Sequence, residues 1–253
     1  MTSLAAARRF GRIEHLVGAT LAALFVLAFA IPVAAQSDST GRKPLVTVRD
    51  GAWLAGAAGA SALLIGSDAR ITRAALESSI QRGGIARSSL DVASEFGGPG
   101  ALAFSAGLWG VGKLTHHRTM ERVGLRAAEA IMISGAVTSA LKGFTGRARP
   151  DHSPGNARDF AFARGIRERE GYDSFASGHS STAFALASVL DAQWARLSPK
   201  RPRWIRPVLY AGAALTAVSR VFDNRHWASD VLMGSAIGII GGHGVVRWHA
   251  DRP

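Results

Sequence analysis

The chain has 253 residues, of which 47% are hydrophobic, so one large domain with a substantial apolar core is the simplest expectation. It contains no cysteine, which excludes disulfides, thiolate metal sites and cysteine nucleophiles. The formal net charge of +12 favours anionic partners, but no helix-turn-helix, zinc-finger or RNA-binding motif accompanies it, so we expect a phosphorylated substrate or an anionic membrane surface and no nucleic acid.

Residues 1–35 have the features of an export signal peptide. Three arginines precede an apolar run over residues 19–33, and Val33-Ala34-Ala35 supplies the small residues of a cleavage site, which predicts cleavage after Ala35. An uncleaved anchor helix is the alternative, because the run is long for a signal and contains Pro32. Either interpretation takes the chain out of the cytoplasm, and residues 36–50 predict a mobile linker.

The remaining residues, 51–250, predict helices and no strands, because no alternation of apolar and polar residues is sustained. An amphipathic helix is expected from about Ser67 to Arg82, ended by Gly83-Gly84. The predicted fold is all-α, a bundle of about six Ala/Gly-rich helices. Their apolar runs lie near residues 52–66, 99–112, 127–141, 180–190, 207–218 and 231–246.

The lengths of these runs leave membrane insertion open. A span needs about 20 residues, and several runs are shorter, which also suits a soluble bundle. Gly and Ala at close spacing are typical of packed membrane helices, and the basic loops near residues 117–126 and 196–206 are typical of cytoplasmic loops. We therefore expect a membrane-embedded or membrane-associated protein of a bacterial-type cell envelope, with the polar clusters described next on the exported, periplasmic face.

Three clusters of polar residues, far apart in the chain, predict a site that handles phosphate. Three fixed cations can grip an anion, and a Ser-Gly pair at a helix start can present free backbone amides to it. His226 precedes Asp230 by four residues, one helical turn, so the carboxylate can hold one ring nitrogen and leave the other free to attack phosphorus. The clusters are Lys142 with Arg149-Pro150, Ser177-Gly178-His179, and Ser219-Arg220 with His226 and Asp230.

Each cluster alone has an ordinary interpretation as a basic loop, a helix start or a surface ion pair. Together they resemble the three motifs of the type 2 phosphatidic acid phosphatase and vanadium haloperoxidase superfamily. Ala176 departs from the pattern, since the family has proline there. The motifs are Lys, six residues and Arg-Pro (Lys142, Arg149, Pro150), Pro-Ser-Gly-His (Ala176 to His179), and Ser-Arg, five residues, His, three residues and Asp (Ser219, Arg220, His226, Asp230).

The resemblance implies a phosphatase that needs no metal or other cofactor and forms a covalent phosphohistidine. By resemblance, His226 is the nucleophile, Asp230 its orienting partner, and His179 the general acid and then base. The phosphate oxygens would be held by the cations Lys142, Arg149 and Arg220, the Ser177 hydroxyl and the Gly178 amide.

The apolar helices favour a lipid phosphate or lipid pyrophosphate as the substrate, which makes the membrane a partner. A soluble periplasmic phosphatase of broad specificity, acting on small phosphate esters, is the alternative. A vanadium haloperoxidase is less favoured, because the chain is short and lacks an obvious halide domain. A scaffold without activity would leave a complete set of reacting groups unexplained.

Overall fold

Helices make up the architecture of the protein. The computed structural model describes residues 43–198 and 200–250, and these residues contain no strand. The expected signal peptide and the first part of the linker lie outside them. The helices are α2 (Val48–Glu77), the 3₁₀ helix η1 (Ser79–Arg82), α3 (Ile85–Glu95), α4 (Pro99–Leu114), α5 (Arg118–Thr145), the short α6 (Arg164–Arg167), α7 (Gly178–Leu197), α8 (Ile205–Phe222) and α9 (Ala228–Trp248).

The all-α prediction is confirmed, and each of the six apolar runs lies within one long helix: α2, α4, α5, α7, α8 or α9. The predicted separate helix from Ser67 is wrong, because α2 continues unbroken through that position to Glu77. The chain turns only at Ser78, and Gly83 and Gly84 then adopt φ values of 98° and 91°, which favour glycine. Helix α3, which follows, was not anticipated.

Helices α7 and α9 form the most extensive helix pair and the centre of the bundle. Three glycines of α9, spaced four residues apart, allow this approach. A Cβ atom would lie 2.3 Å from the Ser177 carbonyl oxygen at Gly234, 2.2 Å from that of Ser181 at Gly238, and 2.6 Å from the Ser188 Cβ at Gly242. Only a residue without a side chain therefore permits the backbones to pack this closely.

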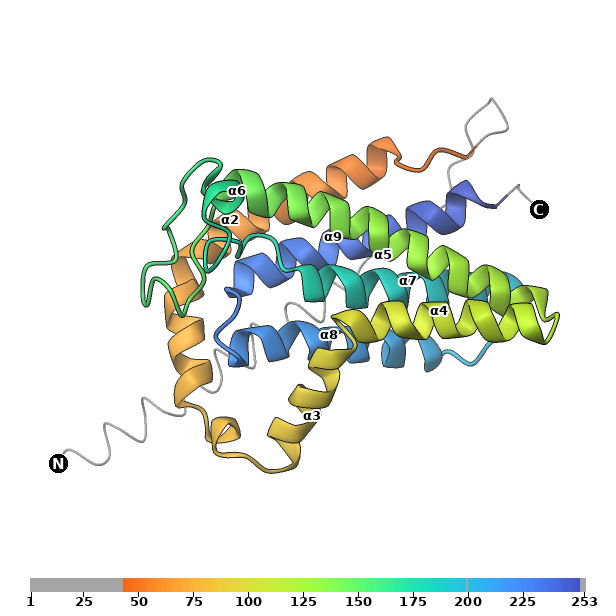
Figure 1. Cartoon of the computed structure of the whole chain (residues 1–253), viewed down its shortest axis with the longest axis horizontal. Helices are drawn as coiled ribbons and strands as arrows, with labels where there is room; N and C mark the ends of the chain where they lie inside the picture. Colours follow the sequence, from red (N-terminus) through yellow and green to blue (C-terminus); the bar gives the residue numbers. More distant parts are fainter. Residues whose placement is uncertain (1–42, 199, 251–253) are drawn as a thin grey trace.

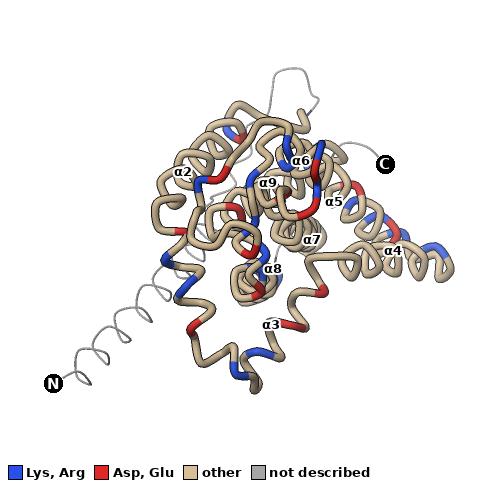
Figure 2. The backbone as a smooth tube through the Cα atoms, turned by 60° about the vertical axis from the view of Figure 1, so that its left-hand side comes forward, with Lys and Arg blue, Asp and Glu red and all other residues tan. Residues whose placement is uncertain are grey.

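One end of the bundle collects the segments that carry the three clusters. In Figure 1, α5 and α8 end, and α7 and α9 begin, at the same left-hand side, where the long connection containing α6 also lies. The loops between α4 and α5 and between α7 and α8 lie at the opposite end. Figure 2 shows Lys, Arg, Asp and Glu gathered around the ends of α7, α8 and α9, whereas long stretches of α2 are uncharged.

The described part of the expected linker is held against the bundle. Thr47 caps α2, accepting a hydrogen bond from the Asp50 amide at 3.1 Å. Arg247 of α9 donates hydrogen bonds to the carbonyl oxygens of Pro44 at 2.9 Å and Leu45 at 2.8 Å. Helix α2 thus begins at Val48, within the residues expected to form the linker.

Helix α9 alone among the helices of the described residues is long and apolar enough to cross a bilayer, and 72% of that stretch is buried inside the protein. Such a helix suits the core of a bundle as well as a membrane span. Many large apolar side chains are nevertheless exposed on the other helices, including Leu63, Leu125, Met132 and Val208.

Candidate active site

The first cluster meets a carboxylate that the motif analysis did not single out. Lys142, in the last turn of α5, donates a hydrogen bond from Nζ to the Asp173 carbonyl oxygen at 2.7 Å. Arg149 forms two hydrogen bonds to the same residue, Nε to Oδ1 at 2.8 Å and Nη2 to Oδ2 at 3.0 Å. Asp173 therefore lies between two of the cations expected to bind phosphate.

The second cluster opens α7 next to the first. Ser177 is the N-cap of α7, and its hydroxyl accepts a hydrogen bond from the Ser180 hydroxyl at 3.0 Å, which leaves its own proton free to donate. A Cβ atom at Gly178 would lie 3.9 Å from the Lys142 Cε, so this helix start faces the Lys142 side chain. The start of α7, where backbone amides are free, thus lies next to a cationic side chain, an arrangement suited to an anion.

The third cluster is joined to the second through the backbone. The His226 amide donates to the Arg220 carbonyl oxygen at 3.2 Å, and the Ser177 amide donates to the Asp230 carbonyl oxygen at 3.0 Å. Arg220, at the end of α8, donates from Nη1 to Ser94 at 2.7 Å and to Asp223 at 2.9 Å. The Arg220 Nε is buried without a hydrogen-bond partner in the described part of the chain.

His226 lies beside Asp230 with its side chain buried. The distance from His226 Nδ1 to Asp230 Oδ2 is 3.6 Å, within ion-pair range but longer than a hydrogen bond. Asp230 Oδ2 instead accepts hydrogen bonds from the Ser174 hydroxyl at 2.5 Å and the Trp227 amide at 2.9 Å. The expected pairing of His226 and Asp230 is therefore a close contact in which the carboxylate is held by other groups.

Arg147 anchors Asp230 from its other side. Its Nη1 donates to Asp230 Oδ1, and its Nη2 donates to Asp68 Oδ2 at 2.8 Å, so one guanidinium lies between two carboxylates. The side chains of all three residues are fully buried. Asp68 comes from α2 and also accepts a hydrogen bond from the Ser229 amide at 3.0 Å, which ties α2 to the start of α9. A buried charge cluster is tolerated only when its members are paired in this way.

Burial and nearby positive charge keep both histidines neutral. Burial is the main reason that the pKa of His226 falls from 6.5 to about 4. The pKa of His179 falls to about 3, first because of burial and then because of the positive charges of nearby cations, among them Arg220, Lys142 and Arg149. A neutral imidazole has a free lone pair, and a bound phosphate dianion would offset these cations and raise both pKa values.

The same cations also lower the pKa of Asp173, and for a carboxyl group this favours the charged form. Burial alone would raise the pKa of its carboxyl, but Lys142 and Arg149 together outweigh that effect and lower it. The carboxylate is therefore ionised at neutral pH and neutralises part of the positive charge in the site.

The structure brings the three predicted clusters to one end of the bundle, as their helix positions suggested. Three residues that share their environment were not singled out: Asp68, Arg147 and Asp173. The sequence around Asp68 does contain a hint, because this carboxylate follows 17 uncharged residues of α2. A charged side chain within an apolar helix is stable when buried only if it is paired with an opposite charge. No local pattern identifies Arg147 or Asp173, since charged residues are common in that loop.

Comparison with known proteins agrees with this geometry. A family profile described as PAP2 superfamily matches residues 124–253, just over half of the chain, and this region contains all three clusters. The fold is similar to that of the transmembrane PAP2-type phosphatidylglycerolphosphate phosphatase from Bacillus subtilis, with a TM-score of 0.62 and 21% sequence identity over 81% of this chain and 96% of that chain.

Curated relatives are similar over shorter stretches. The lipid A 1-phosphatase of Porphyromonas gingivalis is 38% identical over 96 residues, which cover 38% of this chain and 20% of that protein. Diacylglycerol pyrophosphate phosphatase 1 of Saccharomyces cerevisiae is 34% identical over 127 residues, 42% of this chain and 44% of that protein. The chain thus matches less than half the length of these relatives. The profile match and the shared fold, together with the assembled motifs, place the chain in the PAP2 superfamily.

Proposed function

We propose that this protein is a metal-independent phosphatase that hydrolyses a phosphate monoester or pyrophosphate of a lipid through a phosphohistidine intermediate. The observation that carries the proposal is the meeting of two neutral histidines, one buried and one partly buried, with three cations at one end of the helix bundle. The names of the relatives, lipid A 1-phosphatase and diacylglycerol pyrophosphate phosphatase, support a phosphorylated lipid as the substrate class.

In the first step, the lone pair of His226 Nε2 attacks phosphorus and the bond to the leaving oxygen breaks. His179, protonated once the dianion has bound, gives its proton to that oxygen, which releases an alcohol or a phosphate. Asp230, held by Arg147, stabilises the positive charge that develops on His226.

In the second step, a water molecule attacks the phosphohistidine and His179 accepts its proton. The phosphorus–nitrogen bond breaks, its electron pair returns to His226, and inorganic phosphate leaves. Lys142, Arg149 and Arg220, with the Ser177 hydroxyl and the Gly178 amide, hold the equatorial oxygens, whose charge is spread in the transition state.

The positions of the basic loops support a site on the exported side of the membrane. The connection between α7 and α8 contains Lys200, Arg201 and Arg203 and lies opposite the candidate site. Basic loops face the cytoplasm in membrane proteins, which supports a site on the exported face of the inner membrane.

A soluble periplasmic phosphomonoesterase is the second candidate, and one observation favours it. The single span candidate in the described residues, α9, is 72% buried inside the protein. The requirement for detergent during purification separates the two candidates, because a protein that stays monodisperse without detergent is not embedded in a bilayer.

The test is phosphate release in EDTA from phosphatidic acid, a lipid pyrophosphate and p-nitrophenyl phosphate, for the wild type and His226→Ala. We expect release from the lipids, and a loss in kcat of more than about 10³-fold in the variant, because the nucleophile is gone. An alkali-stable, acid-labile phosphoprotein should form in the wild type only. Unchanged activity in the variant would refute the phosphohistidine mechanism.

A further inference from the structure

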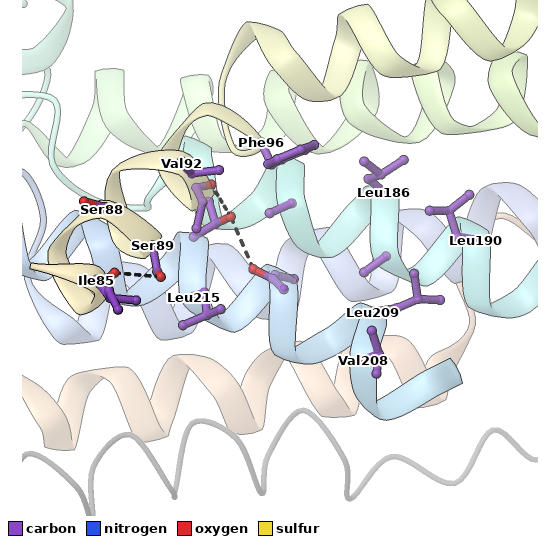
Figure 3. A pocket seen from close by; sticks show the side chains of 16 residues that line it. Ile85, Ser88, Ser89, Val92, Phe96, Leu186, Leu190, Val208, Leu209 and Leu215 are labelled. Atoms are coloured by element: carbon purple, nitrogen blue, oxygen red, sulfur yellow. Dashed lines mark hydrogen bonds between the residues drawn. The ribbon is translucent and has the colours of Figure 1, made fainter. Parts of the chain in front are cut away.

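An apolar pocket of about 710 Å³ opens between α3, α7 and α8 (Figure 3). One face of each helix lines it, with residues spaced three or four apart, as the 3.6-residue period requires. Its walls include Val92 of α3 and Phe96 directly after that helix, Ala183 and Leu190 of α7, and Gly212 and Thr216 of α8. The nearby core cluster fills the space beneath these faces, but it leaves this volume open.

The pocket continues the two helix faces that carry catalytic groups. On α7, His179 precedes the lining residue Ala183 by four residues, one turn. On α8, Arg220 follows the lining residue Thr216 by four residues. Both helices therefore lead from the pocket to the candidate site within about one turn, roughly 5–6 Å.

The chain between α3 and α4 lies at the junction between pocket and site. Gly97 fits between the two, since a Cβ atom there would lie 2.3 Å from the Thr216 Cγ2 and 2.9 Å from the His179 Cβ. A Cβ atom at Gly98 would lie 3.3 Å from His179 Nε2. Gly97 thus touches both the pocket wall and the expected general acid, and Gly98 touches the general acid.

The pocket has the chemistry of a hydrocarbon site. Thr216 donates its hydroxyl hydrogen bond to the Ala93 carbonyl oxygen at 2.6 Å, and Ser89 donates to that of Ile85 at 2.8 Å, so neither proton is free for a polar ligand. The rim is also apolar, with Val92, Val208 and Leu215 exposed. Apolar surface left open to water at this scale favours an apolar occupant.

We propose that this pocket receives one acyl chain of the phosphorylated lipid while the phosphate lies among the cations next to His179. The inference rests on the proposed phosphatase function and adds to it the binding site for the chain. From Val208 to Thr216 the α8 wall is about 12 Å long, at 1.5 Å per residue, so the pocket holds the part of the chain closest to the headgroup. The rest of the chain extends past the apolar rim.

Gly212 offers a direct test, because a Cβ atom at this lining position meets nothing within 4 Å. The substitution Gly212→Phe places a ring in the pocket without a backbone clash. The matched control is Gly59→Phe on α2, where a Cβ atom also meets nothing within 4 Å. Gly59 does not line the pocket.

The assay compares kcat/KM for dipalmitoyl and dihexanoyl phosphatidic acid in the same detergent micelles, with p-nitrophenyl phosphate as an ester without a chain. Gly212→Phe should lower the ratio of long-chain to p-nitrophenyl phosphate activity about tenfold. This is the effect expected if the ring prevents about two methylene groups of the acyl chain from being buried. The effect should be smaller for dihexanoyl phosphatidic acid. Gly59→Phe should leave the ratio at its wild-type value.

The proposal would be overturned if Gly212→Phe left the ratio of long-chain to p-nitrophenyl phosphate activity unchanged, or if it lowered activity equally on all three substrates. An unchanged ratio together with an altered oligomeric state would assign the pocket to a second copy of the chain. Binding of cis-parinaric acid, followed by its fluorescence, needs no turnover. If the wild type binds this probe and Gly212→Phe does not, the apolar site stands even where His226→Ala shows that the phosphatase mechanism is wrong.

Discussion

Asp230 receives hydrogen bonds from several directions, and its position depends on a residue 162 positions earlier in the chain. Arg147 holds one oxygen of Asp230 and also binds Asp68 of α2, with all three side chains inaccessible to solvent. At the scale of single residues, Asp68 is thus a positioning residue: it contacts no expected substrate group and acts through Arg147.

We expect Asp68→Asn to lower kcat about tenfold and to destabilise the protein by about 2–3 kcal/mol, because it leaves Arg147 with one carboxylate instead of two. Asp191→Asn is the matched control. Asp191 is also buried and pairs with Arg201 at 2.6 Å, but it lies three turns further along α7 than His179. Denaturant unfolding and steady-state kinetics measure the two effects. Equal losses of kcat in both variants would show that Asp68 matters only for stability.

Asp173 limits the positive charge available to phosphate, since it accepts hydrogen bonds from Lys142 and Arg149. We expect Asp173→Asn to strengthen competitive inhibition by inorganic phosphate about fivefold, or about 1 kcal/mol, because one negative charge next to the anion is removed. Asp159→Asn is the control, as Asp159 pairs with Arg164 at 2.8 Å and is equally half-buried. Weaker inhibition in Asp173→Asn would show that the carboxylate orients the cations instead.

At the scale of the helices, the close contact of α7 and α9 sets the position of the candidate catalytic groups. Ser177 and Asp230, which belong to different motifs, lie at the start of α7 and α9 and are joined by a backbone hydrogen bond of 3.0 Å. The glycine spacing along α9 keeps the two helix starts in register. The motifs would separate if this contact were widened.

Gly238→Ala tests the contact, because its methyl group would lie 2.2 Å from the Ser181 carbonyl oxygen. We expect a loss of about 1–3 kcal/mol in the free energy of unfolding, although alanine is the better helix former. Gly59→Ala, where a Cβ atom meets nothing within 4 Å, should instead gain up to about 1 kcal/mol. Chemical denaturation measures both, and a stabilised Gly238→Ala would mean that the helices can move apart freely.

At the scale of the whole molecule, the low pKa values of His226 and His179 make folding sensitive to acid. The pKa of His226 is about 4 in the folded protein and 6.5 as its ordinary value, so the unfolded chain binds more protons between these two pH values. Stability is therefore fully retained above about pH 6.5 and falls as the pH is lowered toward 4. His179, with a pKa of about 3, adds a second contribution of the same sign.

We expect the free energy of unfolding to fall by up to about 1.4 kcal/mol per pH unit for each of these histidines between pH 6 and 4.5. The variant His226→Gln should lose one such contribution and show a shallower slope than the wild type. Denaturant melts at half-unit pH steps measure the slopes. Identical slopes would mean that His226 is protonated as readily in the folded protein as in the unfolded chain.

The sequence by itself determined the helical class, the six long apolar helices and the residues of the three motifs, because helix periodicity and motif spacing are local properties. It also placed the motifs at helix ends, where they can face one another. Tertiary structure alone decided that α2 continues as one helix to Glu77, that Asp68 reaches Arg147, and that Asp173 lies between two cations. The last two depend on contacts between residues 79 and 24 positions apart, whose energies no local pattern contains.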